Sequence, residues 1–235
     1  MKRFIILLTA LVLMLSACAE TFPAFPLEGV KIGIDPGHQE KANSSREPVA
    51  PGSAETKAKT AGGTRGAATG TPEYVLTLEV SLKLREILEE LGAEVLMTRE
   101  THDVDLSNIE RAVMMNEWGA DLVLRIHADG SVDKNVHGTG MYVRKTGTCA
   151  AESAELAFCL LDCVCARTGS YKKGVYRRDT YTGLNWSEVP CVLVEMGYMT
   201  NYEENIKLED SAYQDEIVRG LAEGIILWVN KGAEE

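Results

Sequence analysis

Apolar residues recur along this chain with two alternating periods, one typical of helices and one typical of strands. Between residues 73 and 92 they form a stripe with helical spacing, and Gly92 ends it. Ser107 and Glu110 have the spacing of a capping box at the start of a second helical stretch. Short apolar runs between such stretches predict strands. The predicted helices cover residues 73–92, 107–119, 150–169 and 211–230, and the predicted strands cover 30–34, 93–99, 120–128, 138–144 and 189–197.

This alternation of strands and helices predicts an α/β fold. We expect a single domain over residues 28–232, with a twisted, mostly parallel mixed sheet flanked by helices on both faces. The run at 138–144 alternates polar and apolar residues and is interpreted as an edge strand. Residues 39–72 are small, polar and rich in glycine, and we expect them to form a long loop insertion.

The first residues have the pattern of an export signal. Two basic residues precede an apolar run from Phe4 to Leu15, which is short for a membrane span. The following LSAC, ending at Cys18, resembles a bacterial lipobox, and this resemblance implies cleavage before Cys18 and attachment of a lipid to it. We therefore expect a lipoprotein signal peptide at 1–17 and a tether at 18–27. The alternative is an ordinary signal peptide in which Cys18 is incidental.

Composition and charge narrow the class of protein. Hydrophobic residues make up 45% of the chain and charged residues 25%, as in an ordinary globular protein. The formal net charge is −11, and nothing basic is clustered strongly enough to bind a phosphate backbone. Nucleic acid is therefore not expected as a partner.

Six cysteines are present, so five remain after Cys18, an odd number for an exported protein. Cys159, Cys163 and Cys165 lie together in a stretch with helical periodicity, without a histidine or a CxxC pair. We interpret them as small apolar side chains on a helix. A disulfide or a metal site is the alternative.

Polar residues that can carry chemistry stand at the ends of three predicted strands. The first strand ends in Asp35-Pro36-Gly37-His38, the strand at 120–128 ends in His127, and the last strand ends in Glu195. Ligands of open α/β sheets bind beyond the carboxyl ends of the strands. These three strands are therefore expected to bring two histidines and a glutamate to one edge of the sheet.

A hydrolytic zinc site needs three protein ligands and one open position. His38 and His127 can supply two nitrogens, and Glu73, at the start of the first long helix, can supply a carboxylate. The alternative for Glu73 is a residue that only favours the positive end of a helix dipole. Because residues 39–72 connect His38 to Glu73, we expect this segment to form one wall of a cleft.

Glu195 follows four apolar strand residues, where a carboxylate is costly unless it has a partner or a function. Beside a metal it can act as a general base and then as a general acid. The alternative is a buried ion pair. Motifs of other hydrolases and of nucleotide-binding proteins are missing: the chain has no G-x-S-x-G, no P-loop and no H-E-x-x-H.

Five motifs occur in a familiar order: IDPGH, a glutamate that opens an amphipathic helix, VLMTRE, ADLVLRIHAD and VLVEMGYMTNYEEN. Together they resemble the catalytic domain of zinc-dependent N-acetylmuramoyl-L-alanine amidases (amidase type 3) over about residues 30 to 230. The IDPGH histidine matches His38, and the histidine of the family's S-I-H-A motif matches His127. Gln39, where the family often has glycine, and the long 39–72 segment depart from its pattern.

The resemblance implies that His38, Glu73 and His127 bind one zinc ion and that Glu195 is catalytic. It implies hydrolysis of the amide bond between N-acetylmuramic acid and L-alanine in peptidoglycan. With the lipobox, it implies an enzyme outside the cytoplasm, anchored by lipid to the bacterial membrane and facing the cell wall. The partners are then peptidoglycan and the membrane. The alternatives are another zinc peptidase that acts on the stem peptide, or a catalytically silent wall-binding protein.

Three further residues lie near these motifs. Arg99 and Arg111 are interpreted as members of structural ion pairs. Asp35 is a candidate for orienting His38 through a hydrogen bond, or else for capping the turn through its side chain.

Overall fold

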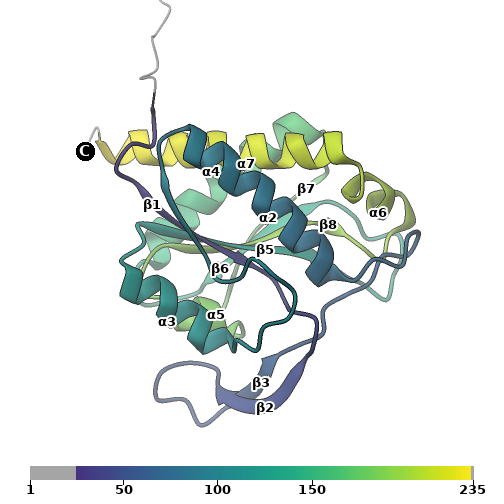
Figure 1. The fold of residues 1–235 in the computed structure, drawn as a ribbon, viewed down its shortest axis with the longest axis horizontal. Coiled ribbons are helices and arrows are strands. Elements are labelled where there is room, and N and C mark those ends of the chain that lie inside the picture. The colour runs from purple at the N-terminus through teal and green to yellow at the C-terminus, as the bar shows by residue number, and fades with distance from the viewer. Residues whose placement is uncertain (1–24, 234–235) are drawn as a thin grey trace, which may run out of the picture.

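The computed structural model describes residues 25–233, so the expected signal peptide, Cys18 and most of the tether lie outside the described residues. A six-stranded sheet in the order β4-β1-β5-β8-β6-β7 crosses the domain (Figure 1). All neighbouring strands are parallel except β6 and β8. The predicted α/β fold with a mostly parallel mixed sheet is confirmed. The strands are β1 (Lys31–Pro36), β4 (Glu94–Met97), β5 (Leu122–Asp129), β6 (Thr139–Arg144), β7 (Lys172–Arg178) and β8 (Cys191–Tyr198).

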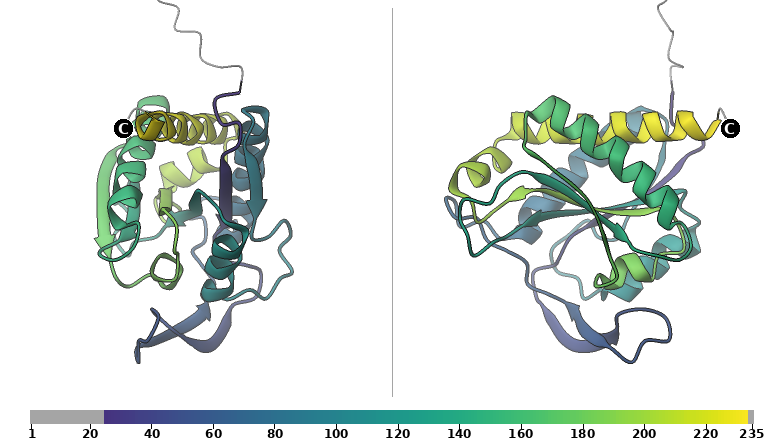
Figure 2. Two further views of the ribbon diagram at one scale, coloured as in Figure 1. Left: turned by 90° about the vertical axis from the view of Figure 1, so that its left-hand side faces the viewer. Right: turned by 180° about the vertical axis from the view of Figure 1, so that it is seen from behind.

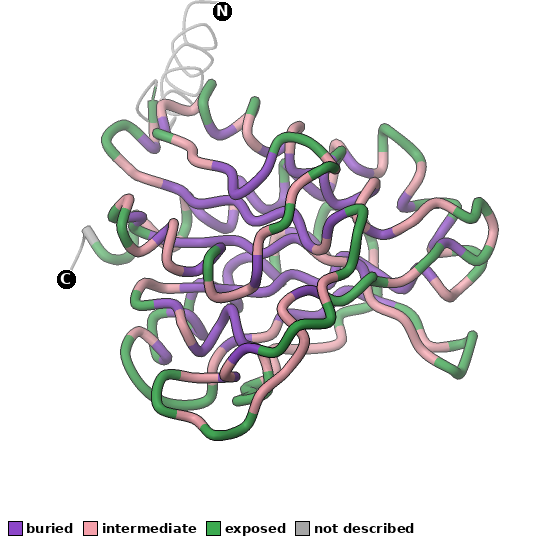
Figure 3. Tube along the Cα trace, turned by 60° about the horizontal axis from the view of Figure 1, so that its bottom comes forward, coloured by how far each residue is buried: buried purple, intermediate pink, exposed green. Residues whose placement is uncertain are grey.

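Helices cover both faces of this sheet, but unequally (Figures 1 and 2). The larger layer consists of α2 (Glu73–Glu90), α4 (Ala150–Thr168) and α7 (Ser211–Ala233). The smaller layer consists of α3 (Asn108–Trp118) and α5 (Thr182–Asn185). A further helix, α6 (Tyr202–Leu208), precedes α7. Figure 3 shows the buried strands in the middle and the exposed residues around them.

Alternation along β5 divides its side chains between the two layers. Leu122 and Leu124 belong to the large apolar cluster that includes α2, α4 and α7. Val123 belongs to the smaller cluster with Met115 of α3. Because side chains two apart share a face, His127 projects on the same side of the sheet as Val123. The candidate site therefore lies on the less covered face, where a ligand has room.

The segment 39–72 is not the loop that the sequence predicted. It contains β2 (Asn43–Pro48) and β3 (Thr56–Thr60), which form an antiparallel pair that extends from the body of the domain on the side of α3 and α5 (Figures 1 and 2). Besides the bonds between its two strands, the hairpin is held to the body of the domain: Trp186 Nε1 donates to Pro48 O, and Asn108 Nδ2 donates to Lys59 O. A polar hairpin fixed in this way leaves no apolar pattern in the sequence.

The position predicted for the strand at 138–144 is also wrong. β6 lies between β8 and β7, so β7 forms that edge of the sheet. The sequence of β7, KKGVYRR, is too polar to predict a strand, so the pattern leaves β6 without a neighbour on that side.

The structure bears on the state of the cysteines and on whether a helix could span a membrane. All five cysteines among the described residues are free thiols, and Cys159 is buried in α4, which agrees with a packing role. Within residues 25–233, none of the helices is both long enough and apolar enough to cross a lipid bilayer.

Candidate metal centre

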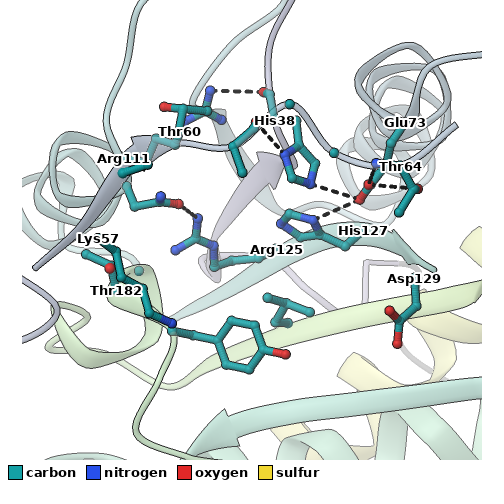
Figure 4. Close-up of a pocket in the computed structure, with 18 of the residues that line it drawn as sticks. His38, Lys57, Thr60, Thr64, Glu73, Arg111, Arg125, His127, Asp129 and Thr182 are labelled. Carbon is teal, nitrogen blue, oxygen red and sulfur yellow. Dashed lines mark hydrogen bonds and ion pairs between the residues drawn. The ribbon is translucent and has the colours of Figure 1, made fainter. Parts of the chain in front are cut away.

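Three separate elements bring two histidines and one carboxylate together at the carboxyl edge of the sheet. His38 follows β1, Glu73 is the first residue of α2, and His127 lies near the end of β5. His38 Nε2 lies 3.1 Å from Glu73 Oε1, and His127 Nδ1 lies 3.0 Å from the same oxygen (Figure 4). The two imidazole rings meet edge to face, with their centroids 4.8 Å apart. The residues that the sequence selected as ligands are therefore neighbours.

Two glycines allow the backbone to close around this cluster. A Cβ atom on Gly37 would lie 2.4 Å from Cε1 of His127, which no side chain tolerates. A Cβ atom on Gly63 would lie 2.9 Å from Glu73 Oε2 and from His38 Cδ2. His38 itself has a φ of 60°, in the left-handed region. Arg111 Nη2 holds this strained turn by donating to His38 O at 3.1 Å.

Replacing Gly37 by alanine is expected to weaken divalent metal binding about tenfold to a hundredfold, because the His127 ring must move away from the new methyl group. Competition with a zinc chelator measures this change. The control is Gly62→Ala, since a Cβ atom on Gly62 would meet nothing within 4 Å. Equal affinities for the two variants would show that the close contact at Gly37 does not position the histidine.

Hydrogen bonds orient the donor atoms. His38 Nδ1 lies 2.8 Å from Ala61 O, and donation of its proton to this carbonyl leaves the Nε2 lone pair facing Glu73. Glu73 Oε2 accepts from Thr64 N at 2.7 Å and from Thr64 Oγ1 at 3.0 Å, which leaves Oε1 for the histidines. The hypothesis that Asp35 orients His38 is wrong, because Ala61 does so.

The donor set fits a zinc ion. Two imidazoles and one carboxylate form the ligand set of hydrolytic zinc sites. Zn–N bonds of about 2.0–2.1 Å place tetrahedral ligands about 3.3 Å apart. The two separations from Glu73 Oε1, 3.1 and 3.0 Å, are close to this value, and the three donor atoms all lie within 4.8 Å of one another. Burial lowers the pKa of His127, which keeps its imidazole neutral. Burial acts to raise the pKa of Glu73. The hydrogen bonds and charges of His127 and His38 outweigh this effect and hold the pKa well below its usual range, so the carboxylate stays ionised.

Glu195 lies beside this cluster, on the strand paired with β5. The register places Glu195 opposite His127, and only 9% of its surface is exposed. Within residues 25–233, Glu195 Oε2 has no hydrogen-bond partner, and Glu195 belongs to no ion pair. The alternative interpretation of Glu195 as a member of a buried ion pair is therefore wrong. Burial, and then the charges of Glu73 and Asp129, raise its pKa well above the usual range of a carboxyl group.

A cleft of about 630 Å³ opens in front of these side chains. The hairpin segment forms one wall, including Lys57 and Thr60, which agrees with the expectation from the sequence. The loop that enters α5 also lines the cleft, and it contacts the hairpin there, because Lys57 Nζ donates to Thr180 O at 2.5 Å. The sequence analysis missed Arg125, which lines the floor. A charged residue inside an apolar strand was the available signal.

A buried ion cluster supports the floor of the cleft. Asp35 Oδ1 pairs with Arg111 Nη1 at 2.7 Å, and Asp35 Oδ2 pairs with Arg125 Nη2 at 2.9 Å. The structural ion pair predicted for Arg111 is therefore present. Arg99 instead donates to backbone carbonyls, including Pro36 O and Gly37 O, and it forms no ion pair among the described residues.

Replacing Asp35 by asparagine is expected to lower the free energy of unfolding at pH 7 by about 3–5 kcal/mol, because two buried cations lose their shared anion. Burial acts to raise the pKa of Asp35, but Arg125 and Arg111 outweigh it and hold it well below its usual range. A depressed folded-state pKa stabilises the fold above the unfolded pKa of about 3.9 and ceases to do so as the pH falls towards the folded value.

Urea unfolding of wild type and Asp35→Asn at several pH values measures this effect. The difference between the two proteins is expected to be constant above about pH 5 and to shrink below about pH 4. A difference that stays the same down to pH 2 would contradict the charge argument.

Comparison with known proteins shows the family of this chain. The family model for N-acetylmuramoyl-L-alanine amidase (Amidase_3) matches residues 32–226. The chain belongs to this family. It is 30% identical over 216 residues to N-acetylmuramoyl-L-alanine amidase Rv3717 of Mycobacterium tuberculosis, covering 83% of this chain and 86% of that protein. The chain is accordingly an amidase enzyme.

Two other amidases show how far the similarity extends. The solved structure of Ami1 from Mycobacterium abscessus is 26% identical, with a TM-score of 0.79 and coverage of 86% of this chain and 100% of that one. LytC of Bacillus subtilis is 26% identical over 201 residues, which cover 86% of this chain but 36% of LytC. The common part is thus the amidase domain, and the candidate ligands His38, Glu73 and His127 lie inside the matched region.

Proposed function

We propose that this amidase hydrolyses the amide bond between the lactyl group of N-acetylmuramic acid and L-alanine in peptidoglycan, and that it depends on one zinc ion. The convergence of His38 Nε2, Glu73 Oε1 and His127 Nδ1 beside the unpartnered carboxylate of Glu195 carries this proposal. The names of its relatives, which are N-acetylmuramoyl-L-alanine amidases, support the substrate. His38, Glu73 and His127 are the zinc ligands, and Glu195 is the catalytic residue.

Bound zinc would polarise the scissile carbonyl and increase the acidity of water. Glu195 accepts the proton of the attacking water and passes it to the leaving amine of L-alanine. The direction of the shift in its pKa suits this task, because a more basic carboxylate takes a proton from water more readily. The volume of the cleft lies within the range of pockets that enclose small ligands, so it can hold the muramoyl end of one stem peptide.

We propose further that the enzyme works outside the cytoplasm, held to the bacterial membrane by a lipid on Cys18 and facing the cell wall. Residues 1–17 are then the signal peptide, 18–27 the tether and 28–232 the catalytic domain. A Cys18→Ser variant is expected to move from the detergent phase of a Triton X-114 separation to the aqueous phase. An unchanged distribution would contradict lipid attachment at Cys18.

The activity is tested with protein lacking residues 1–18, incubated with purified peptidoglycan in the presence of zinc or of a chelator. New L-alanine amino termini without new reducing sugars, lost on chelation, are the expected result. Termini elsewhere in the stem would favour the zinc peptidase. Wall binding without cleavage would favour the catalytically silent protein.

A further inference from the structure

Three buried arginines lie beneath the cleft, and one of them differs from the other two. Arg99, Arg111 and Arg125 are 3%, 2% and 5% exposed. In Arg99, all three guanidinium nitrogens donate to protein acceptors. The same holds for Arg111. These two side chains are fully used in holding the fold together.

Arg125 uses only one of its three nitrogens. Its Nη2 donates to Asn108 Oδ1 at 2.7 Å and pairs with Asp35 Oδ2 at 2.9 Å. Its Nε is buried without a hydrogen-bond partner among residues 25–233, and its Nη1 donates in no hydrogen bond between those residues. Buried donors without partners are costly and rare in folded proteins, so Arg125 needs an acceptor from outside the fold.

Arg125 lies at the floor of the cleft in which the substrate would bind. Arg125 lies on β5 two residues before His127, on the same face of the sheet, and both line the cleft (Figure 4). A Cβ atom on Gly183 would lie 0.8 Å from Arg125 Nη1, so the guanidinium packs directly on the backbone of α5. The arginine is thus built into the floor of the cleft.

The charges around Arg125 select an anion. Asp35 neutralises one of its two arginine partners, so the buried cluster keeps one positive charge. Arg46 and Lys57 add two more from the hairpin wall. The acidic residues that line the cleft, Glu73, Asp129 and Glu195, lie towards the metal cluster and away from Lys57 (Figure 4 labels Lys57, Glu73 and Asp129). The end of the cleft around Arg125 is therefore cationic, although the protein has a net charge of −11, and this end fits a carboxylate better than a neutral carbonyl.

We infer that Arg125 binds the free α-carboxylate of the second residue of the stem peptide, where this residue is a glutamate linked through its γ-carboxyl group. Arg125 and His127 are two residues apart on β5, which corresponds to about 6.6 Å along the strand. An extended peptide covers about 7 Å from the scissile carbonyl to the α-carboxylate two residues further on. With the scissile carbonyl beside His127, this carboxylate reaches Arg125. The inference rests on the proposed amidase function.

The expected consequence is a preference for the acid over the amide at that position. A carboxamide carries no charge and presents an NH₂ donor to the donors of Arg125. A charge-assisted hydrogen bond of the usual strength predicts a preference of about tenfold to a hundredfold in kcat/KM, mainly through KM.

The test uses two muramoyl peptides that differ only in a free or an amidated α-carboxyl group on the second residue. The ratio of their kcat/KM values is measured for wild type, Arg125→Gln, Arg125→Lys and Arg177→Gln. We expect the ratio to fall to about one in Arg125→Gln and to recover in part in Arg125→Lys. The control Arg177 is exposed on β7 and does not line the cleft, so Arg177→Gln is expected to keep the wild-type ratio.

Two results would overturn the inference. One is equal cleavage of both peptides by the wild-type enzyme. This comparison needs no variant, so misfolding of a variant cannot affect it. The other is an Arg125→Gln variant that loses activity equally on both peptides, which would assign Arg125 to a neutral carbonyl or to the fold.

Calorimetric binding of both peptides to Glu195→Gln protein separates this inference from the proposed function. Tighter binding of the acid supports the role of Arg125 even if wild type cleaves neither peptide, in which case the proposed function alone fails. Equal binding of the two peptides contradicts the role of Arg125 whatever the activity.

Discussion

Replacement of Glu195 by glutamine is expected to lower kcat on peptidoglycan about 10²–10⁴-fold, the range usual for loss of a general acid–base group. Glutamine keeps the size of the side chain but cannot accept the proton of the attacking water. The carboxylate is buried, and its Oε2 has no partner among residues 25–233, so the change breaks no hydrogen bond of that oxygen. The zinc content and the thermal stability are therefore expected to stay at wild-type values or, for stability, to rise.

Release of L-alanine amino termini measures kcat, and atomic absorption measures zinc in the same samples. Glu47→Gln is the matched control, because Glu47 is also a buried glutamate but does not line the cleft. It is expected to leave kcat within about twofold of wild type, as for substitutions far from the reacting groups. Loss of zinc from Glu195→Gln would instead assign Glu195 to the metal ligands.

Replacement of Glu73 by alanine is expected to remove zinc and activity together. Both histidines lie against the same oxygen of Glu73, at 3.1 and 3.0 Å, so this carboxylate is the common neighbour in the cluster. Without it, two neutral nitrogens remain, and zinc sites in proteins generally need a third ligand. After dialysis against a weak chelator, the variant is expected to retain almost no zinc, whereas wild type retains its ion.

Glu152→Ala distinguishes this role from a simple helix-dipole effect. Glu152 is an exposed acidic residue in the first turn of α4, just as Glu73 is the acidic residue in the first turn of α2. Its replacement is expected to cost about 0.3–1 kcal/mol of stability without loss of zinc. If Glu73→Ala behaved in the same way, Glu73 would be a dipole residue only.

The sequence predicted well what depends on local pattern. Apolar periodicity separates helices from strands because each element buries one face, and it located β1, β5, β8 and the long helices. The ends of apolar strands also carry information, since parallel strands end at a common edge. This rule predicts that His38, His127 and Glu195 lie at one edge of the sheet.

Only the tertiary structure decided features that depend on contacts between distant residues. The β2–β3 hairpin is held by donors such as Trp186 and Asn108, and β7 completes an edge despite its polar sequence. Neither has an apolar face that a pattern could reveal. The partners of Asp35 and the unused donors of Arg125 also depend on neighbours far away in the chain. The sequence thus predicts local burial and periodicity, because they depend on neighbouring residues. The pairing of buried charges depends on how distant elements pack, so only the tertiary structure determines it.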